Sequence, residues 1–426
     1  MNITEKAILL KKDSTKLAAT SIETRNKALE NILNALSENA DRIFEANHTD
    51  IAEAEKNGIA PAVMKRLKFN EDKLRSSIDS IRSLIGLSDP LNIVTLKRRL
   101  DEGLTLIRST CPIGVIGVIF EARPDALIQI STLCIKSGNC SILKGGSETK
   151  QTNRVLFDII YKTACASGLP EGCMAQAEDR SEIKELLTCD RYIDLIIPRG
   201  SNSFVRYCMD NTRIPVMGHA DGICHIYVAK DADPDMAINC IIDAKTQYSA
   251  VCNAVETVLI DSSIAETFLP LLSKKLTEAG VKQNGNAAVK KLIDCNLMDD
   301  DGYNKEYLDK EISLKIVSGI DEAISHINTF GSHHTDCIMT KNDSEKEYFF
   351  TMVDSANVYC NCSTRFADGY RYGFGAEVGI STGKMPPRGP VGLEGLVTYK
   401  YKLTGEGHTV APYCDGSKNF RFEDLK

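Results

Sequence analysis

The 426-residue sequence predicts an α/β fold with two related parallel-sheet domains. Short strand-like runs alternate with helical segments in two series, which is typical of sheets covered by helices. The run from Ile113 to Phe120 is apolar at nearly every position. A strand of this composition is buried on both faces, as in a parallel sheet.

The N-terminal 90 or so residues are expected to be helical. The tetrapeptide Thr20–Glu23 fits a capping box, in which Thr20 and Glu23 satisfy free amides at a helix start. Apolar side chains then recur at helical spacing and are expected to face the core: Leu29, Ile32, Leu33 and Leu36. Residues 95–120 change to an alternating stretch that leads into the apolar run.

Further strands are expected in each series. The first contains "CSILK", "YIDLIIP" and "ICHIYV", and the second contains "ETVLI", "DCIMT" and "SANVYC". The sequence "DADP" at Asp231–Pro234 is a candidate seam between two domains. Near the C-terminus, "GLVTYKYKLTGEGHTV" is expected to form an extended strand pair at an oligomer interface.

Composition and charge exclude several classes of function. The net charge of -7 at pH 7 argues against a general nucleic-acid-binding role. No run approaches the roughly 18 apolar residues of a membrane-spanning helix, and the N-terminus lacks the pattern of a signal peptide. Fifteen irregularly spaced cysteines favour reduced thiols and a cytoplasmic protein over a disulfide framework.

Two strand-to-helix turns have the composition of phosphate-binding turns. Lys144-Gly145-Gly146-Ser147 follows "CSIL", and Arg199-Gly200-Ser201 follows "DLIIP". Glycines allow close backbone approach, and free amides at a helix N-terminus attract anions. Two unrelated connecting turns with surface cations are the alternative. Gly114 and Gly117 do not complete a dinucleotide fingerprint and are expected to pack within a strand.

Two other segments place charged side chains where ligands commonly bind. Arg123 follows the apolar run, at the carboxyl end of the expected strand, where α/β folds build their sites. A later segment rich in glycine and proline favours a ligand-facing loop, with a long solvated connection as the alternative. Its charged residues include Arg365, Glu377, Lys384 and Arg388.

Cys252 lies in a turn of small residues ahead of "ETVLI". A thiolate is a strong nucleophile, and nearby amides or cations favour the ionised form. A cysteine that packs as a small apolar side chain is the alternative. No metal site is expected, because neither Cys360-x-Cys362 nor the group of His333, His334 and Cys337 completes a structural zinc spacing.

Five segments together resemble the γ-glutamyl phosphate reductases of the aldehyde dehydrogenase superfamily. They are "PIGVIGVIFEARPD", "KSGNCSILKGGSE", "AKTQYSAVCNAVETVLI", "STRFADGYRYGFGAEVGIST" and "RGPVGLEGLVTYKY". The resemblance implies an aldehyde dehydrogenase-like fold of two α/β domains and a small β oligomerisation flap. It also implies NADPH-dependent reduction of L-glutamyl 5-phosphate to L-glutamate 5-semialdehyde, the second step of proline biosynthesis from glutamate.

The resemblance also implies roles for individual residues. Cys252 is the expected nucleophile, and Arg123 is the expected oxyanion donor beside the Cys252 amide. The residues expected to contact NADPH are Lys144, Ser147, Arg199, Gly200, Ser201 and Glu377. The residues expected to contact the anionic groups of the substrate are Lys245, Arg365 and Arg388.

The domain boundaries follow from the same resemblance. The NADPH-binding domain is expected over residues 1–94 and 111–230 with part of 363–390, and the catalytic domain over 231–362. Residues 95–110 and 391–426 are expected to form the flap and the C-terminal segment. A cytoplasmic homo-oligomer is implied, and transient contact with glutamate 5-kinase is a hypothesis because the acyl phosphate is labile.

One departure from the wider superfamily bears on the chemistry. Oxidising members carry a glutamate that activates water to hydrolyse the thioester, whereas "PVMGHADG" here has Met217 and His219 and no glutamate. Without that base, the thioester is expected to survive until the hydride is transferred. Alternatively, His219 in this segment contacts the substrate. Two competing functions stay open, a CoA-acylating aldehyde dehydrogenase and a catalytically silent binding protein.

Overall fold

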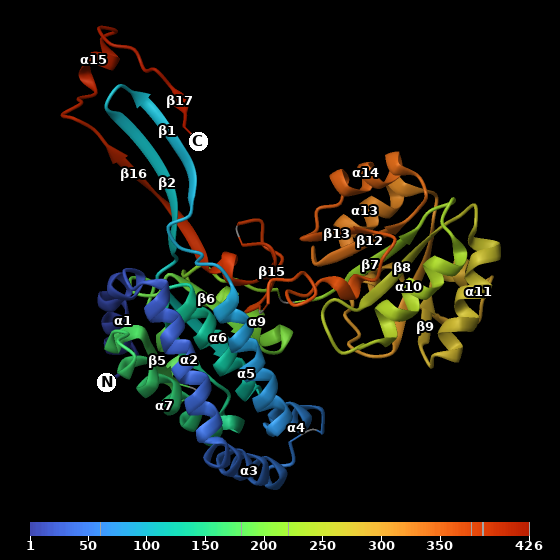
Figure 1. Ribbon diagram of the computed structural model, residues 1–426. Coiled ribbons are helices and arrows are strands. Elements are labelled where there is room, and N and C mark those ends of the chain that lie inside the picture. The colour runs from blue at the N-terminus through green and yellow to red at the C-terminus, as the bar shows by residue number, and fades with distance from the viewer. Residues whose placement is uncertain (60, 180, 220, 376, 386, 426) are drawn as a thin grey trace. The chain divides into compact units, whose positions relative to one another are not determined.

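The computed structural model describes residues 1–426 apart from 60, 180, 220, 376, 386 and 426. The chain forms two compact units: unit 1 is Met1–Met217 with Gly392–Lys426, and unit 2 is Gly218–Val391. Each unit contains its own parallel sheet (Figure 1), which confirms the predicted fold class. No helix among the described residues is both long and apolar enough to cross a membrane.

Five helices form the N-terminal part of unit 1, as predicted. They are α1 (Ile3–Ala18), α2 (Ile22–Glu38), α3 (Ala40–Lys56), α4 (Pro61–Leu67) and α5 (Glu71–Gly86). The predicted cap is wrong by one residue: the Ser21 side chain accepts the hydrogen bond from the Thr24 amide at the start of α2. Thr20 instead donates to the Leu17 carbonyl at the end of α1.

A parallel sheet in the order β5-β4-β3-β6 forms the centre of unit 1. Its strands are β3 (Val115–Phe120), β4 (Cys140–Lys144), β5 (Met174–Ala177) and β6 (Leu195–Arg199). The helices around it are α6 (Pro124–Lys136), α7 (Lys150–Ala166), α8 (Glu182–Leu187) and α9 (Asn202–Asp210). Every residue of β3 is buried, so the apolar run is a central strand. Gly117 packs closely there, since an added Cβ would lie 2.6 Å from Ile196 Cδ1.

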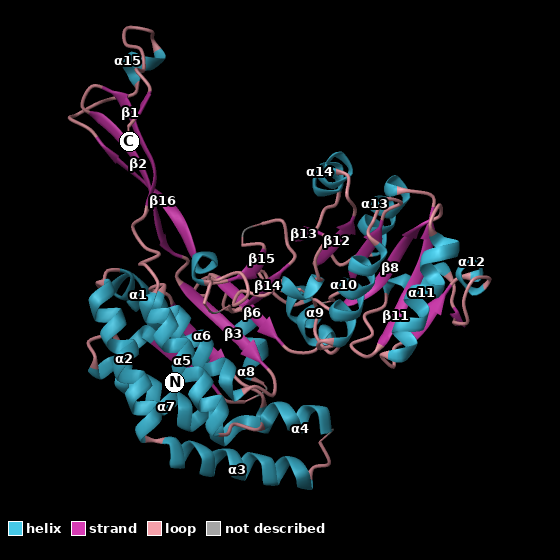
Figure 2. Ribbon diagram, turned by 45° about the vertical axis from the view of Figure 1, so that its right-hand side comes forward, coloured by secondary structure: helices cyan, strands magenta, loops and turns pink. Residues whose placement is uncertain are grey.

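An antiparallel sheet extends from the helical part of unit 1 (Figure 2). Its order is β16-β2-β1-β17. The strands are β1 (Val94–Asp101), β2 (Leu104–Pro112), β16 (Val397–Thr404) and β17 (Glu423–Asp424), and α15 (Ala411–Cys414) precedes β17. The predicted C-terminal strand pair is wrong, because the segment forms one strand, β16, which pairs with β2 along its whole length.

Unit 2 is built on a parallel sheet in the order β10-β9-β11-β8-β7-β12-β13. Its strands are β7 (Cys224–Val228), β8 (Val255–Asp261), β9 (Lys282–Gly285), β10 (Asn296–Leu297), β11 (Glu311–Val317), β12 (Thr335–Met339) and β13 (Asn357–Cys360). Its helices are α10 (Pro234–Thr246), α11 (Ala265–Glu278), α12 (Ala287–Lys290), α13 (Ile320–Phe330) and α14 (Asp343–Met352). A short antiparallel pair, β14 (Gly379–Ser381) and β15 (Gly389–Val391), follows.

The seam between the compact units differs from the expected one. Strand β7, expected in the first series, pairs with β8 and β12 in the sheet of unit 2. Asp231–Pro234 therefore lies inside unit 2, where the Asp233 side chain caps α10 by accepting from the Met236 amide. A polar segment with proline was mistaken for a linker because helix starts favour the same residue types.

Candidate active site

Cys252 lies half-buried in the turn between α10 and β8. A Cβ atom added at Gly222 would overlap the carbonyl oxygen and the Cα of Cys252, so only glycine allows this approach. The Cys224 thiol donates a hydrogen bond to the Cys252 carbonyl oxygen at 3.2 Å. The backbone of Cys252 is thus held by the segment that leads into β7.

The segment around Arg365 holds the other side of the same turn. Arg365 Nε donates to Gln247 Oε1 at 3.0 Å, and Nη1 donates to Asn253 Oδ1. Thr364 Oγ1 donates to the Asn253 carbonyl oxygen at 2.7 Å, and Asn253 Nδ2 donates to the Ala367 carbonyl oxygen at 2.9 Å. These contacts fix the residues before and after Cys252.

This placement changes the interpretation of Arg365. The residue was expected to contact substrate, but it is only 8% exposed and is bonded to the turn that carries Cys252. Burial, and then the neighbouring Arg371 cation, lower the pKa of Arg365 from its ordinary value. We therefore regard Arg365 as a positioning residue for Cys252.

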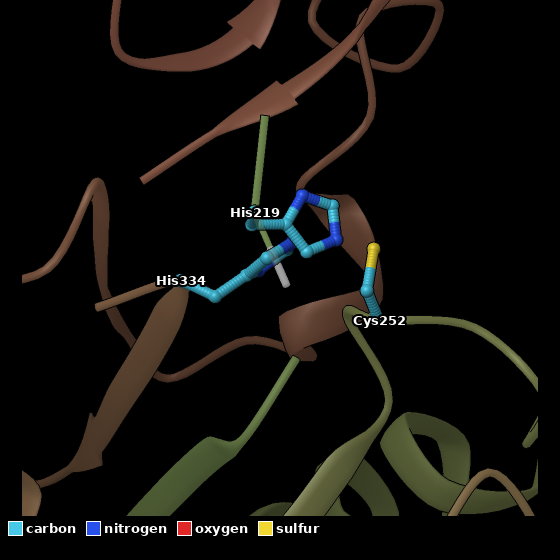
Figure 3. A group of neighbouring side chains, drawn as sticks. All are labelled: His219, Cys252 and His334. Atoms are coloured by element: carbon cyan, nitrogen blue, oxygen red, sulfur yellow. The ribbon is translucent and has the colours of Figure 1, made fainter. Parts of the chain in front are cut away.

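Two histidines lie beside the Cys252 side chain (Figure 3). His219 Nδ1 lies 2.8 Å from the Ile380 carbonyl oxygen, and because a carbonyl only accepts, Nδ1 carries a proton. The rings of His219 and His334 meet edge to face, with centroids 4.8 Å apart. One ligand atom from each of His219, Cys252 and His334 lies within 4.8 Å of the others.

His334 was not predicted to lie near Cys252. It directly precedes β12, and its fully buried Nδ1 lies 2.8 Å from Thr335 Oγ1. The order of β7, β8 and β12 in the sheet brings the two residues together. No local sequence pattern contains that strand order; "SHHTDCIMT" signals only that two histidines come ahead of a strand.

Lys245 does not occupy the position expected of a substrate ligand. Its Nζ lies 2.6 Å from Glu256 Oε2, and neither side chain is exposed. A lysine with these surroundings is already neutralised by its partner, so it offers no charge to an incoming anion. The expected contact between Lys245 and substrate is therefore not supported by the structure.

Glu377 and Arg388 lie in the glycine-rich segment of unit 2. Glu377 Oε2 accepts a hydrogen bond from the Gly369 amide at 2.7 Å. Arg388 Nη2 lies 3.3 Å from Asp354 Oδ1, and Lys384 Nζ lies 2.7 Å from Asp354 Oδ2. Arg388 keeps one buried nitrogen, Nε, without a hydrogen-bond partner among the described residues.

The two predicted phosphate turns lie in unit 1, and both end parallel strands. Lys144 closes β4, is 3% exposed and donates from Nζ to the Gly145 carbonyl oxygen. Burial lowers the pKa of Lys144 from its ordinary value. Ser147, two residues beyond Gly145, is exposed. The turn combines a lysine, two glycines and the start of a helical segment at a strand end.

The second turn already holds a carboxylate. After β6, the Ser201 amide at the start of α9 donates to Glu121 Oε2 at 2.9 Å. The Arg199 carbonyl oxygen accepts from the Glu121 amide at 2.9 Å, and a Cβ added at Gly200 would overlap the Glu121 carboxylate. An acceptor bound at this helix start shows that the turn suits an anion.

Arg123 is exposed at the start of α6, directly after β3 and its neighbours Glu121 and Ala122. It belongs to unit 1, whereas Cys252 belongs to unit 2. Its assignment as an oxyanion donor stays a prediction.

Comparisons with known proteins agree with one another. The aldehyde dehydrogenase family model matches residues 5–291. A gamma-glutamyl phosphate reductase from Acetivibrio thermocellus is 53% identical over 425 residues, covering 100% of this chain and 99% of that protein. The corresponding protein from Ruminiclostridium cellulolyticum is 53% identical over 412 residues, covering 97% and 95%.

A solved structure extends the likeness to the fold. The crystal structure of gamma-glutamyl phosphate reductase from Thermotoga maritima is 36% identical to this chain and has a TM-score of 0.93. The match covers 95% of this chain and 99% of that one.

Proposed function

Since this chain belongs to the aldehyde dehydrogenase family, and within it to the gamma-glutamyl phosphate reductases, we propose that it reduces L-glutamyl 5-phosphate to L-glutamate 5-semialdehyde with NADPH. The reaction releases phosphate and is the second step from glutamate to proline. The proposal depends above all on how Cys252 is held. Gly222 and Cys224 contact its turn on one side, and Arg365 bonds to it on the other. A nucleophile needs this fixed placement before attack.

Cys252 performs the covalent part of the proposed reaction. Its thiolate attacks the acyl carbon, a carbon–sulfur bond forms, the carbon–oxygen bond to phosphate breaks, and phosphate leaves. When bound, the reduced nicotinamide supplies a hydride for the acyl carbon. The Cys252 amide, with Arg123, is the proposed donor set for the negative charge on the acyl oxygen. Cleavage of the carbon–sulfur bond then releases the aldehyde and restores the thiolate.

The family implies a nicotinamide cofactor, and the strand-end turns of unit 1 fit one. Lys144 and Ser147 are proposed to contact the adenosine ribose and its phosphate, and Arg199, Gly200 and Ser201 the pyrophosphate. The carboxylate already bound to the Ser201 amide supports the second assignment. Glu377 is proposed to contact the nicotinamide ribose.

Arg388 is the best placed of the three expected substrate ligands. Lys245 is neutralised inside the unit, and Arg365 is committed to the Cys252 turn. Arg388 has a partly exposed side chain and a buried nitrogen without a partner among the described residues. A guanidinium with spare donors suits the carboxylate or phosphate of the substrate.

The antiparallel sheet of unit 1 is proposed to mediate homo-oligomerisation. Its strand β16 exposes three large side chains, Tyr399, Tyr401 and Leu403, each more than half exposed. Exposed apolar side chains in one strand are typical of an interface. We also propose a cytoplasmic location and transient contact with a separate glutamate kinase. If the contact matters, physically separating the two enzymes is expected to reduce the flux from glutamate to the semialdehyde.

One assay tests the function. The reverse reaction, reduction of NADP⁺ with glutamate 5-semialdehyde, is expected to require phosphate and to be lost in Cys252→Ala. The exposed Cys414→Ser serves as the matched control. Activity without phosphate contradicts the proposal, and dependence on CoA favours a CoA-acylating enzyme. Retained NADP⁺ binding without any activity identifies a silent binding protein.

A further inference from the structure

The side chains of His219, Cys252 and His334 have the composition of a zinc site. Their ligand atoms, two imidazole nitrogens and one sulfur, lie within 4.8 Å of one another. Zinc binds cysteine sulfur at about 2.3 Å and histidine nitrogen at about 2.0–2.1 Å with tetrahedral geometry. Tetrahedral angles at those lengths separate the ligand atoms by about 3.3–3.6 Å. An inward movement on the order of 1 Å, within reach of side-chain rotation, completes such a site.

The hydrogen bonds around both histidines favour metal binding. His219 Nδ1–H donates to the Ile380 carbonyl oxygen, which fixes the ring and places Nε2 on its other edge. His334 is fully buried, its Nδ1 lies 2.8 Å from Thr335 Oγ1, and its Nε2 has no hydrogen-bond partner among the described residues. A backbone carbonyl that accepts from the far nitrogen, as at His219, is an arrangement that orients metal-binding histidines.

The site is only partly buried and offers three protein ligands. Figure 3 shows the two rings and the Cys252 side chain converging from three segments, and Cys252 and His219 are only half-buried. Three protein ligands leave the fourth tetrahedral position for water. A thiolate with two imidazoles selects zinc over magnesium or calcium, which prefer oxygen ligands.

We propose that Zn²⁺ binds His219, Cys252 and His334 and thereby reversibly inhibits the enzyme. The cation replaces the thiol proton, and the sulfur lone pair that would attack the acyl carbon forms the zinc–sulfur bond instead. No oxidation or reduction takes place, and a chelator restores the thiol. The binding stands on these three residues alone, whereas the inhibition rests on the proposed role of Cys252 as nucleophile.

Cobalt provides a readout that does not depend on activity. Co²⁺ added to the metal-free protein is expected to give a thiolate-to-cobalt charge-transfer band and the d–d bands of a tetrahedral site, at one equivalent. Both are expected to vanish in Cys252→Ser. His219→Ala and His334→Ala are each expected to weaken binding by about 100-fold or more, because loss of even an outer partner of a ligand costs about 10–100-fold.

Matched variants separate this site from the other cysteines and histidines. Cys414→Ser changes an exposed residue and His408→Ala a half-buried one, both in the antiparallel sheet region, and both variants are expected to keep the bands. Bands that persist in Cys252→Ser, or Zn²⁺ inhibition equally strong in His334→Ala and wild type, overturn the proposal. If His334→Ala does not fold, His334→Gln takes its place.

Alkylation of the wild-type protein gives an independent test. Zn²⁺ is expected to slow the reaction of Cys252 with iodoacetamide, Mg²⁺ is expected to have no effect, and a chelator is expected to restore the rate. Unchanged alkylation of Cys252 at saturating Zn²⁺ overturns the site. Protection of Cys252 by Zn²⁺ in a protein without reductase activity would keep the site and remove only the proposed function.

Discussion

Lys245 and Glu256 form an ion pair that is wholly buried, with Nζ and Oε2 2.6 Å apart. Lys245 lies in the last turn of α10, and Glu256 lies near the start of β8. The pair therefore joins the two ends of the turn that carries Cys252. Lys245 also lies over the Tyr307 ring, with Nζ 5.8 Å from its centroid.

Breaking this pair from one side is expected to be costly. Lys245→Met leaves the Glu256 carboxyl buried without its cation, and loss of one partner of such a pair typically destabilises a protein by about 3–5 kcal/mol. The double variant Lys245→Met/Glu256→Leu is expected to lose far less, because no charge stays buried. Urea unfolding at pH 8 measures both free energies. Equal losses in the single and double variants would contradict this account.

The same pair predicts a pH dependence of stability. Burial raises the pKa of Glu256 to about 7, from an ordinary value of 4.5, against the opposing effect of Lys245. A folded pKa above the unfolded one means that the folded protein binds more protons in between. The contribution of Glu256 to the free energy of unfolding is therefore fully present below about pH 4.5 and is lost as the pH rises through about 7.

The double variant isolates this contribution. From pH 5 to pH 8, the unfolding free energy of wild type is expected to fall relative to Lys245→Met/Glu256→Leu, on the order of 1–3 kcal/mol. The comparison removes the other titrating groups, which the two proteins share. A difference that is constant across this range would show that Glu256 does not titrate in the folded state.

Gly222→Ala is expected to displace the turn that carries the proposed nucleophile, Cys252. The added methyl group would overlap the Cys252 backbone, so the turn must move. We expect a loss of about 1–3 kcal/mol in stability and a fall in kcat of about 10–100-fold, because small displacements of reacting groups have effects of this size. Gly86→Ala, where a Cβ meets no atom within 4 Å, is the matched control. Wild-type kcat in Gly222→Ala would contradict the close approach.

Strands rich in apolar and β-branched residues could be predicted from the sequence, whereas a short polar strand could not. β3 is a continuous apolar run, β4 and β8 are rich in apolar and β-branched residues, and all three match their predicted segments closely. β9 was missed because "KQNG" contains no residue with a high preference for strands. The segment forms a strand because it pairs with β11 in the sheet. Local composition therefore identifies a strand only where its residues are the apolar and β-branched types that a buried sheet favours.

The site shows the same division. Cys252 and the two glycine turns could be singled out as candidates because the pattern of each lies within a few consecutive residues, and their roles stay predictions. His334 and the Lys245–Glu256 pair could not be found, since their contacts depend on strand order and burial. A lysine on a helix face has the same local pattern whether it faces solvent or a buried carboxylate. The sequence alone therefore did not indicate that Lys245 pairs with Glu256.

Arg365 is expected to act through Cys252 and not through the substrate. Arg365→Met removes the bonds to Gln247 and Asn253, so kcat is expected to fall by about 10–100-fold. The KM for glutamate semialdehyde is expected to stay within about threefold, because a positioning residue does not bind substrate. The rate of Cys252 alkylation is expected to change in parallel with kcat. Arg365→Lys tests whether charge alone rescues the geometry.

Arg388→Met is the contrasting variant to Arg365→Met. Arg388 is proposed to bind an anionic group of the substrate, so its loss is expected to raise KM by about 10–100-fold, the value of a charge-assisted hydrogen bond. The alkylation rate of Cys252 is expected to stay unchanged. A rise in KM for Arg365→Met, with kcat unaffected, would reverse the two assignments.

Lys144→Met tests how the cofactor is chosen. Lys144 is buried at the end of β4. We propose that its ammonium group binds the extra phosphate that distinguishes NADPH from NADH. Loss of the cation is expected to raise the KM for NADPH by about 10–100-fold and to leave the KM for NADH nearly unchanged, since only NADPH carries that phosphate. The measurement is the ratio of kcat/KM for the two cofactors.

Lys150→Met is the matched control for Lys144→Met. Lys150 begins α7 in the same turn, but its Nζ lies 3.3 Å from Asp179 and its side chain is 39% exposed. A screened surface lysine of this kind contributes little to binding, so its loss is expected to leave the cofactor ratio within about twofold. An equal fall in the ratio for both variants would mean that the turn attracts NADPH by its total charge, and not through Lys144.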